Sequence, residues 1–298
     1  MRSEEPFLTE VVNQGITDSD ILIRFWTIRA LKSNSDFKLL KEHLTNLEND
    51  SFMPNRREVL NIFLDIFPES ADKKLHNALF DHHPSILHYA RYFLSKKSKN
   101  DFSEIYREAI KNPENRKIVG TISGLGETGR KDDAGLLLSY ATHPTNKIRK
   151  ATIQAIARLA AEDYCYLFKA MIEDDSPRVS REAALSLQQC RYQTIFSELW
   201  DLFERTEKTH IKKNILLIAS SLTKWESLIY YIKAITVRDE YIKKIANDYL
   251  EKWLVNFNRS FTMPTSEQID RINIALKFHA KTIGENRKLA IEFNMKAF

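Results

Sequence analysis

The fold is decided by a nine-residue stretch that recurs along the chain and reads Ile-Arg-Lys-Ala-Thr-Ile-Gln-Ala-Ile at residues 148–156. Positions 1, 5, 8 and 9 of this stretch are small or apolar, which is the spacing of one buried stripe on a helix. We call the stretch the repeat motif and number its positions from its first residue. Eight copies follow one another at intervals of 31 or 32 residues, starting at Ile23, Asn55, Ile86, Lys117, Ile148, Val179, Ile211 and Ile242.

A fixed period of this length is typical of a solenoid, in which each unit buries its apolar face only against its neighbours. Position 5 is small or β-branched in every copy, which lets a neighbouring helix approach closely, and position 9 is apolar in every copy. The period therefore predicts one elongated stack rather than two ordinary globular domains.

A second amphipathic segment lies between successive motifs, as at residues 134–141 and 195–203. The acidic and polar residues 173–176 predict a helix N-cap before one of the motifs. Each repeat is therefore expected to be a helix hairpin, and the chain an all-α protein, a right-handed α-solenoid of stacked hairpins. The turn between the two helices carries a proline in several repeats, and the first turn of a helix tolerates the missing N–H of proline. These prolines are Pro54, Pro84, Pro113, Pro144 and Pro177.

The period ends after Trp253, so we expect residues 1–253 to form the solenoid and residues 254–298 a C-terminal helical cap and tail. Thr265 and Gln268 predict a capping box at the start of the cap helix, and Gly284 predicts its end. A terminal helix of this kind would cover the last apolar face of the stack.

The composition is that of a soluble protein, with 43% hydrophobic and 29% charged residues. The net charge of +5 permits an anionic partner without requiring one. We expect Cys165 and Cys190 to be buried reduced thiols, with a disulfide as the less favoured alternative. No run of 18 apolar residues and no signal peptide is present. These features predict a cytoplasmic protein without membrane insertion; a trimmed piece of a membrane-anchored protein is the alternative.

Several motif copies resemble the HEAT repeat family, whose second helix opens with Val-Arg and continues through alanines. The matching segments are Ile148-Arg149-Lys150-Ala151, Val179 with Ala183-Ala184-Leu185, and Ile23-Arg24 with Ala30-Leu31. The short period is most similar to the HEAT-like repeats of phycobilisome lyases, over roughly residues 5–253. The resemblance implies an α-solenoid that binds a partner on its concave face, and it implies no particular reaction. Asn55 and Lys117 depart from the pattern and predict local irregularity.

Residues 124–129 spell G-x-G-x-x-G, the pattern of a dinucleotide-binding turn between a strand and a helix. The repeat register places Gly124 inside a motif helix instead. Gly126 and Gly129 then fall at the end of that helix, where we expect a left-handed C-terminal cap. No cofactor is therefore predicted.

Four histidines lie close together in the sequence: His76, His82, His83 and His88. A zinc site needs three or four converging ligands, and only Asp81 adds a donor nearby. We interpret these histidines as solvated turn residues, with a metal site as the alternative, and predict no metal.

Trp200-Asp201 resembles a pair used by HEAT-like alkylation-repair DNA glycosylases. The pair lies on a first helix, which faces outward in such repeats, so we expect Trp200 to be a core residue. No Ser/His/Asp or Cys/His arrangement is evident, and we predict no catalytic residues and no enzyme activity.

The strongest functional signal is the charge at motif positions 2 and 3, where ten of the sixteen side chains are Lys or Arg and none is acidic. The position 2 arginines have a structural explanation, because Asp50, Asp81 and Asp174 in the turns are available to bind them. The functional alternative is a basic ridge that binds phosphates or acidic protein segments.

We therefore predict a non-enzymatic scaffold that binds a macromolecular partner, which we interpret as a protein, through the concave surface formed by its second helices. A nucleic-acid-binding protein related to the repair glycosylases is the main alternative. A lyase or chaperone for a bound chromophore is the third, and it rests on the repeat resemblance alone. The residues expected to form the binding surface are Arg56, Arg57, Lys150, Arg181, Lys213 and Lys244.

Overall fold

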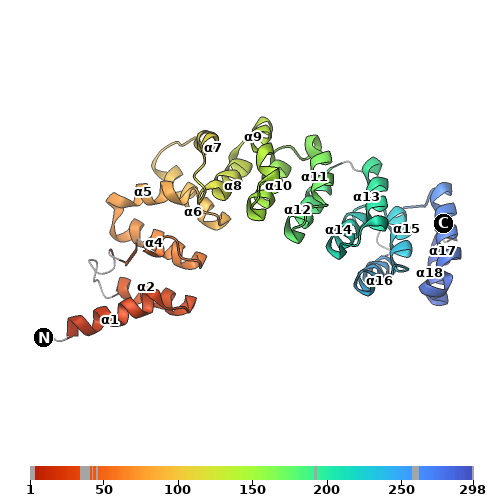
Figure 1. The fold of residues 1–298 in the computed structure, drawn as a ribbon, viewed down its shortest axis with the longest axis horizontal. Coiled ribbons are helices and arrows are strands. Elements are labelled where there is room, and N and C mark those ends of the chain that lie inside the picture. The colour runs from red at the N-terminus through yellow and green to blue at the C-terminus, as the bar shows by residue number, and fades with distance from the viewer. Residues whose placement is uncertain are drawn as a thin grey trace. The chain divides into compact units, whose positions relative to one another are not determined.

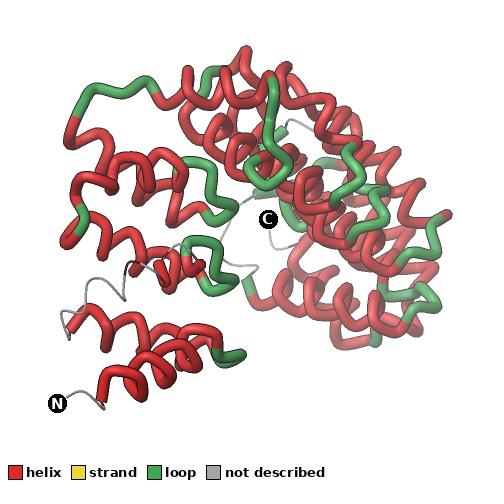
Figure 2. Tube along the Cα trace, turned by 60° about the vertical axis from the view of Figure 1, so that its left-hand side comes forward, coloured by secondary structure: helices red, strands yellow, loops and turns green. Residues whose placement is uncertain are grey.

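The computed structural model describes residues 4–33, 41, 43–44, 46–190, 193–256 and 262–296. These residues form helices, turns and loops, and no strand occurs among them (Figure 2). Contacts divide the chain into two compact units, Met1–Asp133 and Ala134–Phe298. Each unit is a stack of helix hairpins, which confirms the all-α solenoid.

The helices of each unit follow the predicted alternation of first and second helices (Figure 1). The first unit contains α1 (Glu4–Thr17), α2 (Ile21–Ser33), α4 (Met53–Ile66), α5 (Pro68–Ala78), α6 (Pro84–Lys97), α7 (Phe102–Lys111), α8 (Ile118–Thr128) and a 3-10 turn at Lys131–Asp133. The second unit contains α9 (Ala134–Leu137), α10 (Asn146–Ala160), α11 (Cys165–Met171), α12 (Pro177–Leu187), α13 (Gln193–Arg205), α14 (Thr209–Ala219), α15 (Lys224–Ala234), α16 (Glu240–Val255), α17 (Ser266–Ile283) and α18 (Glu285–Lys296), with 3-10 turns at Leu138–Thr142 and Ala161–Tyr164.

The repeat motif falls on the second helix of each hairpin, which is α2, α4, α6 and α8 in the first unit and α10, α12, α14 and α16 in the second. Within each unit these second helices pack on one another in chain order. In the second unit they share the inner side of the curve, and α9, α11, α13 and α15 share the outer side (Figure 1). Equivalent motif positions therefore lie side by side along a unit.

Burial follows the motif closely, since position 9 is buried in all eight copies. Position 1 shows two departures. Ile23 is 45% exposed, and Asn55 is fully buried despite its polarity. The irregularity expected at Asn55 is wrong, because α4 is continuous there. Lys117 precedes α8 as its N-cap residue, so that helix starts later in the motif than the others.

The starts of three helices confirm that proline occupies the first helical turn, and the start of α12 corrects the predicted N-cap. Pro54, Pro84 and Pro177 occupy the first turn of their helices. The N-cap expected from residues 173–176 is wrong, because the side chain of Ser176 makes no capping hydrogen bond. Instead, the backbone N–H of Ser176 donates to Asp174 Oδ1 at 2.8 Å, which orients that carboxylate.

The segment after Trp253 belongs to the second unit, so the contacts place no boundary at residue 253. Helix α17 packs on α15, and the indole N–H of Trp225 donates to the Thr262 carbonyl at 2.6 Å. The predicted capping box of Thr265 and Gln268 is present, and Gly284 ends α17 with a φ of 84°. Left-handed backbone of this kind favours glycine.

The expectation of reduced thiols is wrong, because Cys165 and Cys190 form a disulfide with a Cα–Cα distance of 5.9 Å. It joins the start of α11 to the turn after α12. Disulfides persist in oxidising compartments, so the cysteines no longer support the predicted cytoplasmic location. Among the described residues, no helix is long and apolar enough to cross a membrane.

Candidate functional site

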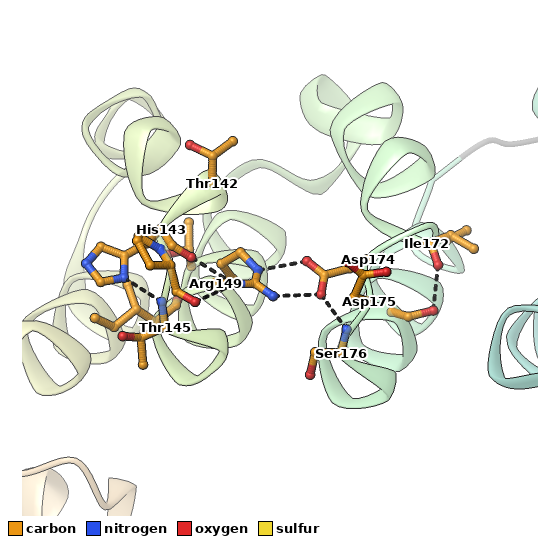
Figure 3. Close-up of polar contacts among 12 residues, drawn as sticks. Thr142, His143, Thr145, Arg149, Ile172, Asp174, Asp175 and Ser176 are labelled. Carbon is orange, nitrogen blue, oxygen red and sulfur yellow. Dashed lines mark hydrogen bonds and ion pairs between the residues drawn. The ribbon is translucent and has the colours of Figure 1, made fainter. Parts of the chain in front are cut away.

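The position 2 arginines bind the acidic turn of the next repeat. In the second unit, Arg149 Nε and Nη2 donate to the two carboxylate oxygens of Asp174, each at 2.8 Å (Figure 3). Arg149 Nη1 also donates to the carbonyls of His143 and Pro144, at 2.8 and 2.9 Å. One guanidinium therefore fastens the turn of its own hairpin to the turn of the next.

The same arrangement recurs twice in the first unit. Arg24 binds Asp50 through Nε and Nη2 at 2.7 and 2.9 Å, and Arg56 binds Asp81 at 2.7 and 2.8 Å. Burial raises the pKa of Asp50, but hydrogen bonds from Arg24 and from the backbone of Phe52 outweigh it, so the pKa lies below its ordinary value. The structural explanation of position 2 is thus correct for these three arginines.

Arg56 must therefore be removed from the predicted binding surface. Its side chain is only 4% exposed, and its donors are used by Asp81 and by the Asp50 carbonyl at 2.6 Å. The charge of Arg56 is neutralised inside the stack, so it is not available to a partner.

The position 3 cations lie in a different environment. In the second unit they are Lys150, Arg181, Lys213 and Lys244, one on each of the consecutive helices α10, α12, α14 and α16, and we call these four the basic column. All are exposed except Lys150, which is half-buried with Nζ 3.7 Å from Glu182. Lys213 donates to the Tyr241 hydroxyl at 3.2 Å. Within the described part of the chain, no ion pair is formed by Arg181 or Lys244.

Two further cations extend the basic column by one helical turn. Lys147 and Arg178 are exposed, lie three residues before Lys150 and Arg181, and form no ion pair among the described residues. Side chains three residues apart share a helix face, so all four point to the same side of α10 and α12. Lys147 and Arg178 lie outside motif positions 2 and 3 and were therefore not predicted, although their spacing of three residues identifies them.

Arg57, the remaining predicted residue, lines a cleft of about 840 Å³ on the second-helix side of the first unit. Its guanidinium lies 5.3 Å from the centre of the Tyr89 ring, and Tyr89 and Phe93 have ring centres 4.7 Å apart. Tyr92 is 50% exposed at the edge, under the ammonium of Lys96. The cleft thus combines aromatic walls with one basic and one acidic side chain, Arg57 and Glu127. Burial raises the pKa of the Tyr89 hydroxyl.

The four histidines do not converge. His76 Nδ1 contacts the Asp72 carbonyl at 2.8 Å, and His83 Nδ1 accepts a hydrogen bond from the Ser85 N–H at the start of α6. His88 lines the aromatic cleft instead. No group of three His, Cys, Asp or Glu side chains placed to hold a metal ion occurs among the described residues.

The glycine motif lies on α8, and its glycines serve packing. A Cβ on Gly124 would lie 2.2 Å from the Tyr106 ring, so the ring occupies the space that the missing side chain leaves. The left-handed cap expected at the end of α8 is wrong, because Gly126 is helical and Gly129 has a φ of −76°. The prediction for Trp200 is confirmed: the indole is buried and stacks on Phe203 at 4.3 Å.

No protein-family model matches the chain, and no curated protein matches it. Among solved structures, the chain is similar to the designed armadillo repeat protein YIII(Dq.V1)4CPAF in complex with peptide (KR)4. The two are 14% identical, the match covers 83% of this chain and 99% of that chain, and the TM-score is 0.31. A likeness of this strength bears on neither the family nor the partner of the chain.

Proposed function

We propose that the chain is a non-enzymatic, HEAT-like repeat scaffold that binds an acidic segment of another protein along the second helices of its second unit. The basic column carries this proposal. Arg149 at position 2 is used inside the stack, whereas Arg181 and Lys244 at position 3 are exposed and form no ion pair within the described residues. Their charge contributes nothing to the stack, so it is available to a partner.

The spacing of the basic column fits a peptide in the polyproline II conformation. Packed helices lie about 8–10 Å apart, and three residues of polyproline II make one turn of about 9 Å, which returns every third side chain to the same face. A segment with an acidic side chain at about every third residue would therefore meet one cation on each helix. The contacts are exposed, so each contributes about 0.2–1 kcal/mol, and affinity comes from their number.

Duplex DNA is the second candidate, because a row of cations at this spacing also suits phosphates. The glycosylase-like pair gives it no support, since Trp200 is buried beside Phe203. A phosphate partner predicts a steep loss of affinity with salt and no preference for the spacing of acidic side chains.

Fluorescence anisotropy with two labelled probes tests the proposal: a Gly/Ser peptide with glutamate at every third residue, and a DNA duplex. We expect the peptide to bind at low salt, and the double variant Arg181→Glu, Lys244→Glu to bind it about tenfold more weakly. The matched control is Arg205→Glu on α13, whose side chain is 69% exposed on the outer side of the same unit.

The control changes the net charge by two and the double variant by four, so a loss of binding free energy in the control that is half of the loss in the double variant would show that overall charge, not the basic column, is responsible. Failure of the peptide to bind at low salt would refute the proposal. Tighter binding of the duplex, with a steep dependence on salt, would favour nucleic acid instead.

A further inference from the structure

The last hairpin leaves a row of large apolar side chains exposed. Ile274 and Phe278 on α17 are 55% and 78% exposed, and Leu289 and Phe293 on α18 are 53% and 71% exposed. Each pair is four residues apart and so shares one face of its helix. The single residue Gly284 joins the two helices and folds α18 back beside α17 (Figure 1). We call these four side chains the terminal apolar stripe.

The opposite side of this hairpin is firmly docked on the second unit. Ile272 and Leu276 on α17 and Ile291 on α18 are buried. Arg271 Nη2 lies 2.8 Å from Glu226 on α15, and Arg287 Nη2 lies 2.6 Å from Glu251 on α16. The terminal apolar stripe therefore points away from the stack, on the side where a further repeat would pack.

A hairpin that closes a solenoid normally has a polar outer face, because that face meets water. Helix α17 packs on α15, but the outer face of the α17–α18 hairpin is apolar. Contiguous apolar patches rimmed by charge mark protein–protein contacts. The stripe is therefore an interaction surface.

The charges around the stripe indicate what covers it. On the exposed face of α17, Glu267 and Asp270 precede Ile274, and Lys277 and Lys281 follow it. All four charged side chains are exposed, and none forms an ion pair among the described residues. The face is thus acidic at its start and basic at its end.

Such a helix is complementary to an antiparallel copy of itself. When Ile274 lies opposite Ile274 of a second copy, residues at equal distances on either side also lie opposite each other. Glu267 then faces Lys281 of the copy, Asp270 faces Phe278, and Lys277 faces Arg271, whose guanidinium is bound by Glu226. The two-fold axis repeats the Glu267–Lys281 pair at the other end of the contact, so each end brings opposite charges together.

We propose that the terminal apolar stripe binds a second copy of this chain, giving a two-fold symmetric dimer in which two α17–α18 hairpins pack as four helices. Phe278 and Phe293 supply the apolar contact. The charges of α17 set the antiparallel orientation.

Light scattering on the eluting full-length chain tests the dimer. The expected mass is twice the chain mass of 34.8 kDa, and Phe278→Glu or Phe293→Glu is expected to elute as a monomer with an unchanged helical spectrum. Tyr166→Glu on α11 is the matched control, because Tyr166 is also 71% exposed but lies off the stripe. This control should stay dimeric.

Charge exchange tests the orientation. Lys281→Glu should weaken the dimer at least about tenfold at low salt, because it places two carboxylates opposite each other at each end of the contact. Adding Glu267→Lys to the same chain should restore it. A monomer at all concentrations, a dimer that Phe278→Glu leaves intact, assemblies larger than a dimer, or no rescue by the double exchange would each overturn the proposal.

Discussion

Arg149 of α10 holds Asp174 in the turn before α12 through two parallel hydrogen bonds of 2.8 Å. The side chains of Arg149 and Asp174 are 16% and 7% exposed. The guanidinium and the carboxylate have matching geometry, so the pair is both directional and charge-assisted. Since the two residues come from neighbouring hairpins, the pair links one repeat to the next.

Removing the guanidinium should destabilise the second unit. We expect Arg149→Met to lower the free energy of unfolding by about 3 kcal/mol, because it leaves the Asp174 carboxylate buried without a counter-charge. Urea denaturation followed by circular dichroism measures the change. Lys208→Met is the control: it breaks the exposed Lys208–Asp175 pair, and a loss of less than about 0.5 kcal/mol is expected. Similar losses for the two variants would contradict the structural role of Arg149.

Asp133 should make the first unit sensitive to acid. Hydrogen bonds from Arg107 at 2.7 and 3.1 Å and from the Arg130 N–H hold the pKa of Asp133 below its ordinary value of 3.8. A group whose pKa is lowered by folding stabilises the folded state above its unfolded pKa. That stabilisation is lost as the pH falls through the folded pKa.

We therefore expect the unfolding midpoint of the wild type to drop as the pH falls below about 4. Asp133→Asn should be less stable at neutral pH by about 2 kcal/mol and should show a flatter dependence in the acid range. Urea titrations at a series of pH values check this, with Asp132→Asn as the exposed neighbour that keeps the wild-type profile. If the unfolding midpoint of Asp133→Asn falls with decreasing pH as steeply as that of the wild type, the acid sensitivity comes from other carboxylates.

The repeat architecture was predictable from the sequence because every hairpin must bury the same stripe, so Ile156 and Leu187 occupy equivalent buried positions. The inter-repeat ion pairs were also foreseeable, since Asp50, Asp81 and Asp174 follow the period. Whether a given arginine is buried in the stack or exposed on its surface was not predictable. Arg56 and Arg57 are adjacent in sequence, but the helix turns one into the stack and the other onto the surface.

Structural features that occur in only one repeat were not predictable from the repeat pattern. The aromatic cleft depends on Tyr89, Tyr92 and Phe93 in one repeat only, so no column in the sequence marks it. The exposure of Phe278 was equally hidden, because an amphipathic pattern does not show whether a further helix covers its second apolar side. Both features depend on how helices pack beside these side chains, which the pattern within one repeat does not show.

The disulfide should be a large contribution to the stability of the second unit. Cys165 and Cys190 are separated by 25 residues, and closing a loop of that length in the unfolded chain corresponds to about 3 kcal/mol. We expect the double variant Cys165→Ser, Cys190→Ser to unfold at lower urea. Reductant should shift the wild type to the same midpoint and leave the variant unchanged. A wild-type midpoint that is insensitive to reductant would show that the bridge adds no stability.

The glycine pattern at residues 124–129 should respond to substitution as a packing feature. Tyr106 is fully buried, and its hydroxyl donates to the Leu79 carbonyl at 2.9 Å, so the ring cannot withdraw without losing that bond. Gly124→Ala should therefore cost about 2 kcal/mol in overpacking. Gly135→Ala is the matched control, because nothing lies within 4 Å of a Cβ there. It should be neutral or stabilising by up to about 1 kcal/mol.

The same pair of variants separates packing from cofactor binding. A dinucleotide site would need the glycines at a helix N-terminus, where free N–H groups meet the pyrophosphate, but Gly124 lies within α8. Added NAD is therefore expected to leave the thermal unfolding midpoint of the wild type and of Gly135→Ala unchanged. A rise in the wild-type midpoint with NAD, abolished in Gly124→Ala, would reinstate the nucleotide interpretation, since a ligand that binds only the folded state raises its stability.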